Sequence, residues 1–280
     1  MKRVICFLII VFFAFVKDSI SQENKGIDFE VVNNEVTISA SIYLPSGVDH
    51  PVPAVIFIPG SAQETGDSYL PYVPIINGIG YAVVIYDKRG VGKSTGEMIT
   101  VSSKNSERTI GLRAADVNSI VNYLINNSAL NLDKIGLIAS SQGAWVASEL
   151  YKLNKNIGFI INCSGGVASV GASDYYDEIM DDPQLSIKKG NRKVRSFKNL
   201  AGFDPLPIIK QMTIPVLWLY GELDRSHPGL YDIRILKKLN KPNFKFDILE
   251  HTNHDLIDIN TNTISEDLIK ISLEWMSSLK

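Results

Sequence analysis

The chain has 280 residues, of which 45% are hydrophobic and 21% are charged. These fractions are typical of a globular protein and exclude a disordered chain. The formal net charge of −2 offers no basic excess for neutralising phosphates, so we expect no nucleic-acid partner.

The first segment, residues 1–21, has the pattern of a secretory signal peptide. A short basic stretch precedes the continuous apolar run Val4–Val16, which is too short to span a bilayer comfortably. A small-x-small sequence ending at Ser21 resembles a cleavage site and predicts Gln22 as the first mature residue. We therefore expect a secreted or periplasmic protein with no stable membrane insertion after processing. The alternative is an uncleaved N-terminal anchor.

Removal of this segment would leave Cys163 as the single cysteine. An exported chain with one cysteine has no internal disulfide, so its core must supply the stability. Because Cys163 falls within an apolar run, we expect it to be a buried filler rather than a nucleophile.

Residues 22–280 are predicted to form one domain in which strands and helices alternate. The β-rich stretches are Asp28–Val32, Val36–Leu44, Ala54–Ile58, Tyr81–Tyr86, Ile135–Ala139, Ile157–Cys163, Val216–Tyr220 and Phe244–Leu249. From the third stretch onward, runs that are apolar on both faces suit strands covered by helices. Arg113–Leu124 and Ile264–Leu279 carry apolar residues at helical spacing. This alternation predicts a mostly parallel sheet with helices on both faces.

One segment, residues 167–212, is longer than a single crossover helix requires. It contains Tyr175 and Tyr176, followed by the basic stretch Lys188–Lys198. We interpret it as a small helical cap inserted between two strands. The basic stretch is more typical of a solvated helix face than of a binding patch.

The clearest chemical signal is the sequence Ala139-Ser140-Ser141-Gln142-Gly143, which follows an apolar strand and precedes a helix. This is the setting of a nucleophile elbow, a turn so tight that the positions two before and two after the nucleophile must be small. Ala139 and Gly143 meet this requirement if Ser141 is the nucleophile. If Ser140 were the nucleophile, the same positions would hold Ile138 and Gln142, which are too large.

A serine hydroxyl needs a general base, and the base needs a group that orients it. His254 follows the last predicted strand and is the expected base, with His251 in reserve. Asp224 follows the preceding predicted strand and is the expected acid, with Glu222 as the alternative. The resulting order of serine, acid and histidine along the chain is that of a hydrolase triad.

An oxyanion hole requires two backbone N–H groups aimed at the charge that develops on the carbonyl oxygen. Gln142, directly after the nucleophile, would supply one of them. The loop after Ala54–Ile58 would supply the other, from Ser61 or alternatively Ala62, with Gly60 permitting the tight turn.

Gly92-Lys93-Ser94 superficially resembles the end of a phosphate-binding P-loop. The first glycine of that motif would fall at position 87, which is Asp, and a dinucleotide motif would fail at Thr95. We predict neither a cofactor nor a metal site.

Together these motifs resemble the α/β-hydrolase superfamily, and more narrowly bacterial exported esterases of the serine aminopeptidase and dienelactone-hydrolase-like branches. The resemblance covers nearly all of the chain after residue 28. It is carried by Pro59-Gly60-Ser61, Tyr86–Ser94, Ala139–Gly143, Gly221–Asp224 and Asn253-His254. It implies an α/β-hydrolase fold with an eight-stranded sheet, and it implies that Arg89 is a structural buttress near the site. The departures are Ala139 in place of Gly and Pro59 where many members have His.

The expected function is hydrolysis of small-molecule carboxylic esters through a Ser141–His254–Asp224 triad and an acyl-enzyme. A serine peptidase acting on short peptides is the alternative. Cap acids that could hold a substrate amine, although such residues are more typical of a solvated surface, are Asp174, Asp177, Glu178, Asp181 and Asp182. A non-catalytic binding module is a third reading. The acyl group, the alcohol and the oligomeric state are not encoded in any motif.

Overall fold

The structure, a computed structural model, describes residues 25–47, 51–127, 132–198 and 201–279. The predicted signal peptide, residues 1–21, lies outside the described residues. Within the described part, no helix combines the length and apolar character needed to cross a bilayer.

The centre of the molecule is an eight-stranded sheet with the order β1-β2-β4-β3-β5-β6-β7-β8. The strands are β1 (Ile27–Asn33), β2 (Val36–Tyr43), β3 (Val52–Ile58), β4 (Ala82–Tyr86), β5 (Leu132–Ser140), β6 (Ile157–Cys163), β7 (Val216–Gly221) and β8 (Phe244–Leu249). β2 runs antiparallel to both β1 and β4, and the other neighbours are parallel. The prediction of a mostly parallel eight-stranded sheet is confirmed.

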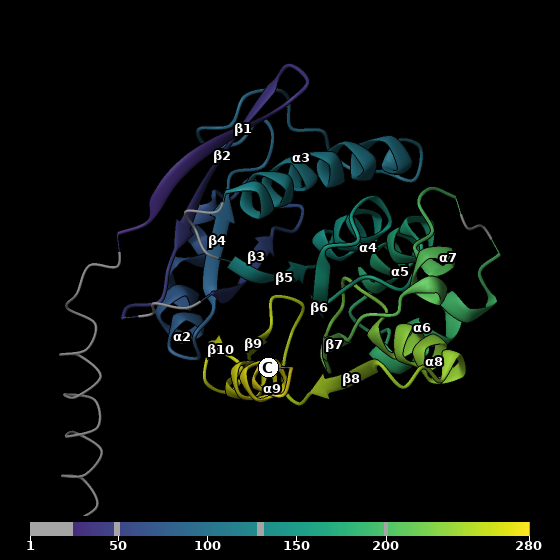
Figure 1. The fold of residues 1–280 in the computed structure, drawn as a ribbon. Coiled ribbons are helices and arrows are strands. Elements are labelled where there is room, and N and C mark those ends of the chain that lie inside the picture. Colours follow the sequence, from purple (N-terminus) through teal and green to yellow (C-terminus); the bar gives the residue numbers. More distant parts are fainter. Residues whose placement is uncertain (1–24, 48–50, 128–131, 199–200, 280) are drawn as a thin grey trace, which may run out of the picture.

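Helices cover both faces of this sheet (Figure 1). One face carries α3 (Ser106–Asn126), α4 (Gly143–Leu153) and α8 (Gly229–Leu239), which bury their apolar sides in the larger core. The other face carries α2 (Val73–Asn77), preceded by the 3-10 helix η1 (Gly66–Tyr72), and α9 (Glu266–Ser277). These helices bury apolar strand residues on both sides, which explains why the central strands lack polar alternation.

The last helix begins two residues later than the apolar pattern suggested. Ser265 caps it, because its side chain accepts a hydrogen bond from the N–H of Leu268. Ile264 instead belongs to β10 (Thr263–Ile264), which pairs with β9 (Ile257–Asp258) in a small separate sheet.

Between β6 and β7, where we predicted the cap, the chain forms α5 (Val170–Met180), α6 (Ile187–Ser196) and α7 (Leu206–Gln211). α5 and α6 enclose a small core of their own, which includes Tyr176, Met180 and Val194. Lys188, Lys189, Arg192, Lys193 and Arg195 lie on the exposed side of α6.

Candidate active site

Ser141 lies in the turn between β5 and α4, with a φ of 51° that few non-glycine residues adopt. Its N–H donates to the carbonyl of Cys163 at 2.7 Å, which ties the turn to the neighbouring strand β6. A Cβ placed on Gly143 would lie 2.4 Å from the carbonyl oxygen of Ile58. The turn therefore has no room for a side chain at Gly143, as the steric argument for Ser141 requires.

The loops after β7 and β8 meet at the same edge of the sheet as this turn, because β5, β6, β7 and β8 are parallel. The N–H of Leu223 donates to the carbonyl of Thr252 at 2.8 Å. A Cβ on Gly221 would lie 2.3 Å from the carbonyl oxygen of Asn253, so the two loops cross in direct backbone contact. This contact brings Asp224 and His254 together.

Ser141, His254 and Asp224 form one hydrogen-bonded row. The Nε2 atom of His254 lies 3.0 Å from Oγ of Ser141, and its Nδ1 atom lies 2.9 Å from Oδ2 and 3.0 Å from Oδ1 of Asp224. A carboxylate beside Nδ1 favours the tautomer with its proton on Nδ1, which leaves Nε2 free to accept the serine proton. The structure thus brings together the three side chains that the sequence nominated.

Asp224 is buried, with 1% of its surface exposed, yet its carboxylate is well supplied with donors. The backbone N–H groups of Ser226 and His227 each donate to Oδ1 at 2.8 Å. These donors satisfy the hydrogen-bonding capacity of a buried side chain that would otherwise lack partners. The pKa of His254 is lowered by burial, but the hydrogen bond and charge of Asp224, with help from Asp255, outweigh this and raise the pKa above 6.5.

His251 and Glu222, the alternatives for the base and the acid, have other partners. His251 is exposed, and its backbone N–H donates to Oε2 of Glu222 at 3.1 Å. No described contact joins either of them to Ser141.

Cys163 is buried, and burial raises the pKa of its thiol to about 12, as expected for a structural cysteine.

The loop after β3, which we expected to supply an oxyanion-hole donor, lies beside Ser141. A Cβ on Gly60 would be 3.4 Å from Cβ of Ser141. Two buried cations hold this loop by its carbonyl groups. Nζ of Lys88 donates to the carbonyl of Gly60 at 2.8 Å and also to that of Ala62. Nη2 of Arg113 donates to the carbonyl of Pro59 at 2.6 Å and to that of Gly60 at 3.3 Å.

These contacts set the direction of the N–H group of Ser61. In a planar trans peptide, the N–H points opposite to the carbonyl of the preceding residue. Because the carbonyl of Gly60 is turned toward Lys88 and Arg113, the N–H of Ser61 is turned away from them. The second expected donor, Gln142, stands at the N-terminus of α4, where backbone N–H groups lack partners within the helix. Arg113 also holds the side chain of Gln142 through its Oε1 atom.

Arg89 forms a paired hydrogen bond with Asp116 of α3, in which both oxygens of the carboxylate accept at 2.6 Å. It thereby ties the loop after β4 to the helix that carries Arg113. Asp87 supports the same loop, because its carboxylate accepts from the N–H groups of Gly66 and Lys93, each at 2.8 Å. The glycine-rich stretch that superficially resembled a P-loop is thus held by contacts within the protein.

Sequence reasoning missed Lys88 and Arg113. Arg113 lies four residues before Val117 and seven before Ile120, on the apolar stripe of α3. A charged residue on a buried stripe requires a buried partner, and this was the available signal. Lys88 carried no comparable signal, because it lies in a loop.

Sequence reasoning also missed a second buried row beside Asp224. Oγ of Ser173 lies 3.2 Å from Nδ1 of His227, whose Nε2 lies 2.7 Å from Oδ2 of Asp232. His227 is 3% exposed and Asp232 is 0% exposed, so a substrate cannot reach this row. Ser173 belongs to α5, and His227 lies in the same loop as Asp224. The row therefore links the cap region to the loop that carries Asp224.

The aromatic residues near the site have different roles. Tyr176 donates its hydroxyl proton to the backbone carbonyl of Asp224 at 2.9 Å, and Trp145 donates to the carbonyl of Ala168 at 2.8 Å.

In the described part of the chain, no group of three or more His, Cys, Asp or Glu side chains has an arrangement that could hold a metal ion.

Comparisons with known proteins address the fold. The sequence profile of a family described as "alpha/beta hydrolase fold" matches residues 53–165. An esterase of Pyrococcus furiosus has a TM-score of 0.66 and 19% identity, over 91% of this chain and 92% of the other. An α/β serine hydrolase homologue of Coxiella burnetii has a TM-score of 0.61 and 15% identity, over 89% and 97%. A proline iminopeptidase of Mycobacterium smegmatis has a TM-score of 0.65 and 13% identity, over 90% and 98%. No curated protein sequence matches the chain at a significant level.

At these identities the structural likeness concerns the fold alone. The profile match runs from β3 through the turn at Ser141 to the end of β6, which is the central part of the sheet. The structural likeness extends over about nine tenths of the chain, well beyond the residues that the profile matches. This chain therefore has the α/β-hydrolase fold.

Proposed function

We propose that the protein is a serine hydrolase that cleaves small-molecule carboxylic esters, with Ser141 as nucleophile, His254 as general base and acid, and Asp224 as the orienting carboxylate. The observation that carries this proposal is the continuous row from Oγ of Ser141 through both ring nitrogens of His254 to Asp224. Both contacts fall within the range in which proton transfer between heavy atoms is efficient.

In the first half of the reaction, Oγ of Ser141 attacks the ester carbonyl carbon while its proton passes to Nε2 of His254. The resulting imidazolium is stabilised by Asp224, and the oxyanion is stabilised by the N–H groups of Ser61 and Gln142. When the intermediate collapses, the bond to the alkoxy oxygen breaks and His254 returns the proton to the leaving alcohol. The acyl group stays on Ser141 as an ester.

In the second half, His254 takes a proton from a water molecule as the water oxygen attacks the acyl carbon. The bond to Oγ of Ser141 then breaks, His254 returns the proton to the serine, and the carboxylic acid leaves. All proton transfers pass through one imidazole, so the chemistry requires no group beyond those in the row and the oxyanion donors.

Ser141→Ala tests the proposal directly. We expect it to abolish turnover of p-nitrophenyl butyrate while leaving the thermal unfolding midpoint close to that of the wild type. Ser119→Ala is the matched control, because it removes a serine hydroxyl that donates to the carbonyl of Ala115 within α3, and it should retain turnover. Retained turnover in Ser141→Ala would reject the assignment. A fluorophosphonate probe should label Ser141 in the wild type, and a lack of both labelling and turnover would favour a non-catalytic binding module.

A peptidase acting on short peptides is a second candidate, because the same row can serve amides. The specific observation in its favour is that Asp255 and Asp177 both add negative charge near His254 and contribute to its raised pKa. Such charge could hold the amine of a substrate. Comparing the kcat/KM for a p-nitrophenyl ester with that for an aminoacyl p-nitroanilide separates the two, since only a peptidase should cleave the anilide efficiently.

A further inference from the structure

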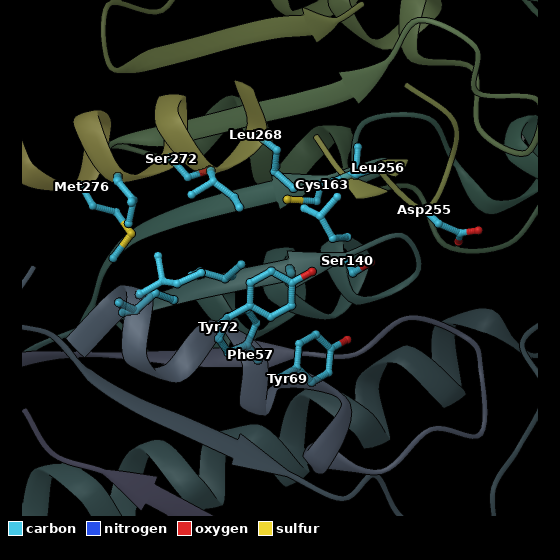
Figure 2. A pocket seen from close by; sticks show the side chains of 17 residues that line it. Phe57, Tyr69, Tyr72, Ser140, Cys163, Asp255, Leu256, Leu268, Ser272 and Met276 are labelled. Atoms are coloured by element: carbon cyan, nitrogen blue, oxygen red, sulfur yellow. The ribbon is translucent and has the colours of Figure 1, made fainter. Parts of the chain in front are cut away.

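An apolar cavity of about 130 Å³ lies next to the proposed nucleophile, on the sheet face that is covered by α2 and α9. Figure 2 shows Tyr69 and Tyr72 on one side of it and Leu268, Ser272 and Met276 on the opposite side. The first two belong to η1 and the last three to α9. The sheet forms the third wall.

The central strand β5 shows that this space is real and open to solvent. Leu137 points to the other face and is fully buried, at 0% exposure. Ile138 and Ser140 point into the cavity and are only half-buried, although β5 has a neighbouring strand on each side. Side chains on a central strand normally lie under tightly packed helices. Here the helices leave a gap above them.

The position of the cavity relates it to the reaction. Ser140 directly precedes Ser141, while Asp255 and Leu256 directly follow His254, and all three line the cavity. In Figure 2, Ser140 and Asp255 lie toward one end of the cavity and Met276 lies toward the other. Residues that flank Ser141 and His254 in the sequence therefore lie at one end of the cavity, which extends from there along β5.

Given the proposed function, we propose that this cavity binds the acyl group of the substrate. The acyl group it fits is an unbranched aliphatic one of medium length. The part of an ester that stays on Ser141 suits a space walled on three sides, whereas the alcohol must be able to leave. The lining is mostly aliphatic and aromatic, which favours methylene groups over polar substituents.

The length of the chain follows from the dimensions of the lining. From Ser140 to Ile138 the strand advances about 7 Å, which corresponds to an extended chain of roughly six carbons. Ser272 and Met276 of α9 also line the cavity, and they lie farther from Ser140 than Leu268 does (Figure 2). Burial of each methylene should increase kcat/KM by about fourfold until the cavity is filled. Octanoyl esters should therefore be better substrates than acetyl esters.

Ser272→Trp tests the proposal by filling the far part of the cavity. We expect kcat/KM for p-nitrophenyl octanoate to fall at least tenfold, since burial of two or more methylenes at about fourfold each would be lost. The value for p-nitrophenyl acetate should stay within about twofold, because the short acyl group does not reach position 272. Lys270→Trp is the matched control, since it adds the same side chain to the exposed side of α9.

The results of these assays distinguish an error in the cavity assignment from an error in the hydrolase assignment. If no ester is turned over and Ser141 is not labelled, the hydrolase assignment itself is wrong. If esters are turned over but Ser272→Trp and Lys270→Trp give the same chain-length profile, only the cavity assignment is wrong. The wild-type profile provides a test that does not depend on the folding of a variant, because a steady fall from acetate to octanoate would also overturn the proposal.

Discussion

Replacing Lys88 by Met tests how the loop after β3, which carries the proposed oxyanion donor Ser61, is positioned. Met keeps most of the length of the side chain but removes the ammonium group that holds the carbonyls of Gly60 and Ala62. A hydrogen bond from a charged donor is worth about 1.5–3 kcal/mol. Because Lys88 is 4% exposed, its removal also relieves the cost of burying a charge, so we expect a net stability loss of only about 1–3 kcal/mol.

The effect on the reaction should be larger than the effect on stability. Loss of one oxyanion donor costs about 10²–10³ in kcat. Arg113 still holds the carbonyls of Pro59 and Gly60 in the variant, so the N–H of Ser61 would be loosened rather than removed. We therefore expect kcat to fall by roughly 10- to 100-fold with little change in KM, because the donor acts mainly in the transition state.

The pH profile provides an independent readout. Burial, followed by the charge of Arg113, lowers the pKa of Lys88 to about 8. As the pH rises through this value, Lys88 loses its charge and its hydrogen bonds to the loop weaken. Wild-type kcat should therefore decline several-fold above about pH 8, and Lys88→Met should lack this decline.

Lys93→Met is the matched control, because Lys93 is exposed in the same loop. The assay is steady-state hydrolysis of p-nitrophenyl butyrate between pH 5 and pH 10, corrected for spontaneous hydrolysis, with thermal unfolding measured in parallel. If Lys88→Met and Lys93→Met have the same kcat and the same decline in kcat at alkaline pH, Lys88 does not position the N–H group of Ser61.

Two further predictions concern the proposed triad. Asp255→Asn removes a charge that helps to raise the pKa of His254, so the acid limb of kcat/KM should move to lower pH, because the imidazole must be neutral to accept a proton. A pH–rate profile measures this, and a shift toward higher pH would contradict it. Gly143→Ala places a Cβ 2.4 Å from the carbonyl oxygen of Ile58, so we expect a loss of about 1–3 kcal/mol in the free energy of unfolding and a strong loss of turnover. Urea unfolding and ester hydrolysis test this, and wild-type values for both would show that the turn tolerates a larger residue.

The sequence by itself was sufficient for the sheet and for the position of Ser141. Apolar runs such as Ile157–Cys163 are continuous along the chain, and their alternation with helical patterns specifies a parallel sheet. The choice of Ser141 over Ser140 rests on steric limits within a single turn, which involve only neighbouring residues such as Ala139 and Gly143. Information of this kind is local, so it can be read without coordinates.

The sequence favoured His254 over His251 and Asp224 over Glu222, but only the tertiary structure shows which of these side chains meet. The two histidines share the loop after β8, and the two acids share the loop after β7. Where these loops cross, His254 contacts Ser141 and Asp224 contacts His254, whereas the N–H of His251 bonds to Glu222. Lys88 and Arg113 meet at the carbonyl of Gly60 although they lie on different elements, and the cavity beside Ser140 exists because α9 and η1 are held apart across the sheet. Such distances depend on how separate elements pack together, and packing is a property of the whole chain that no short stretch of residues specifies.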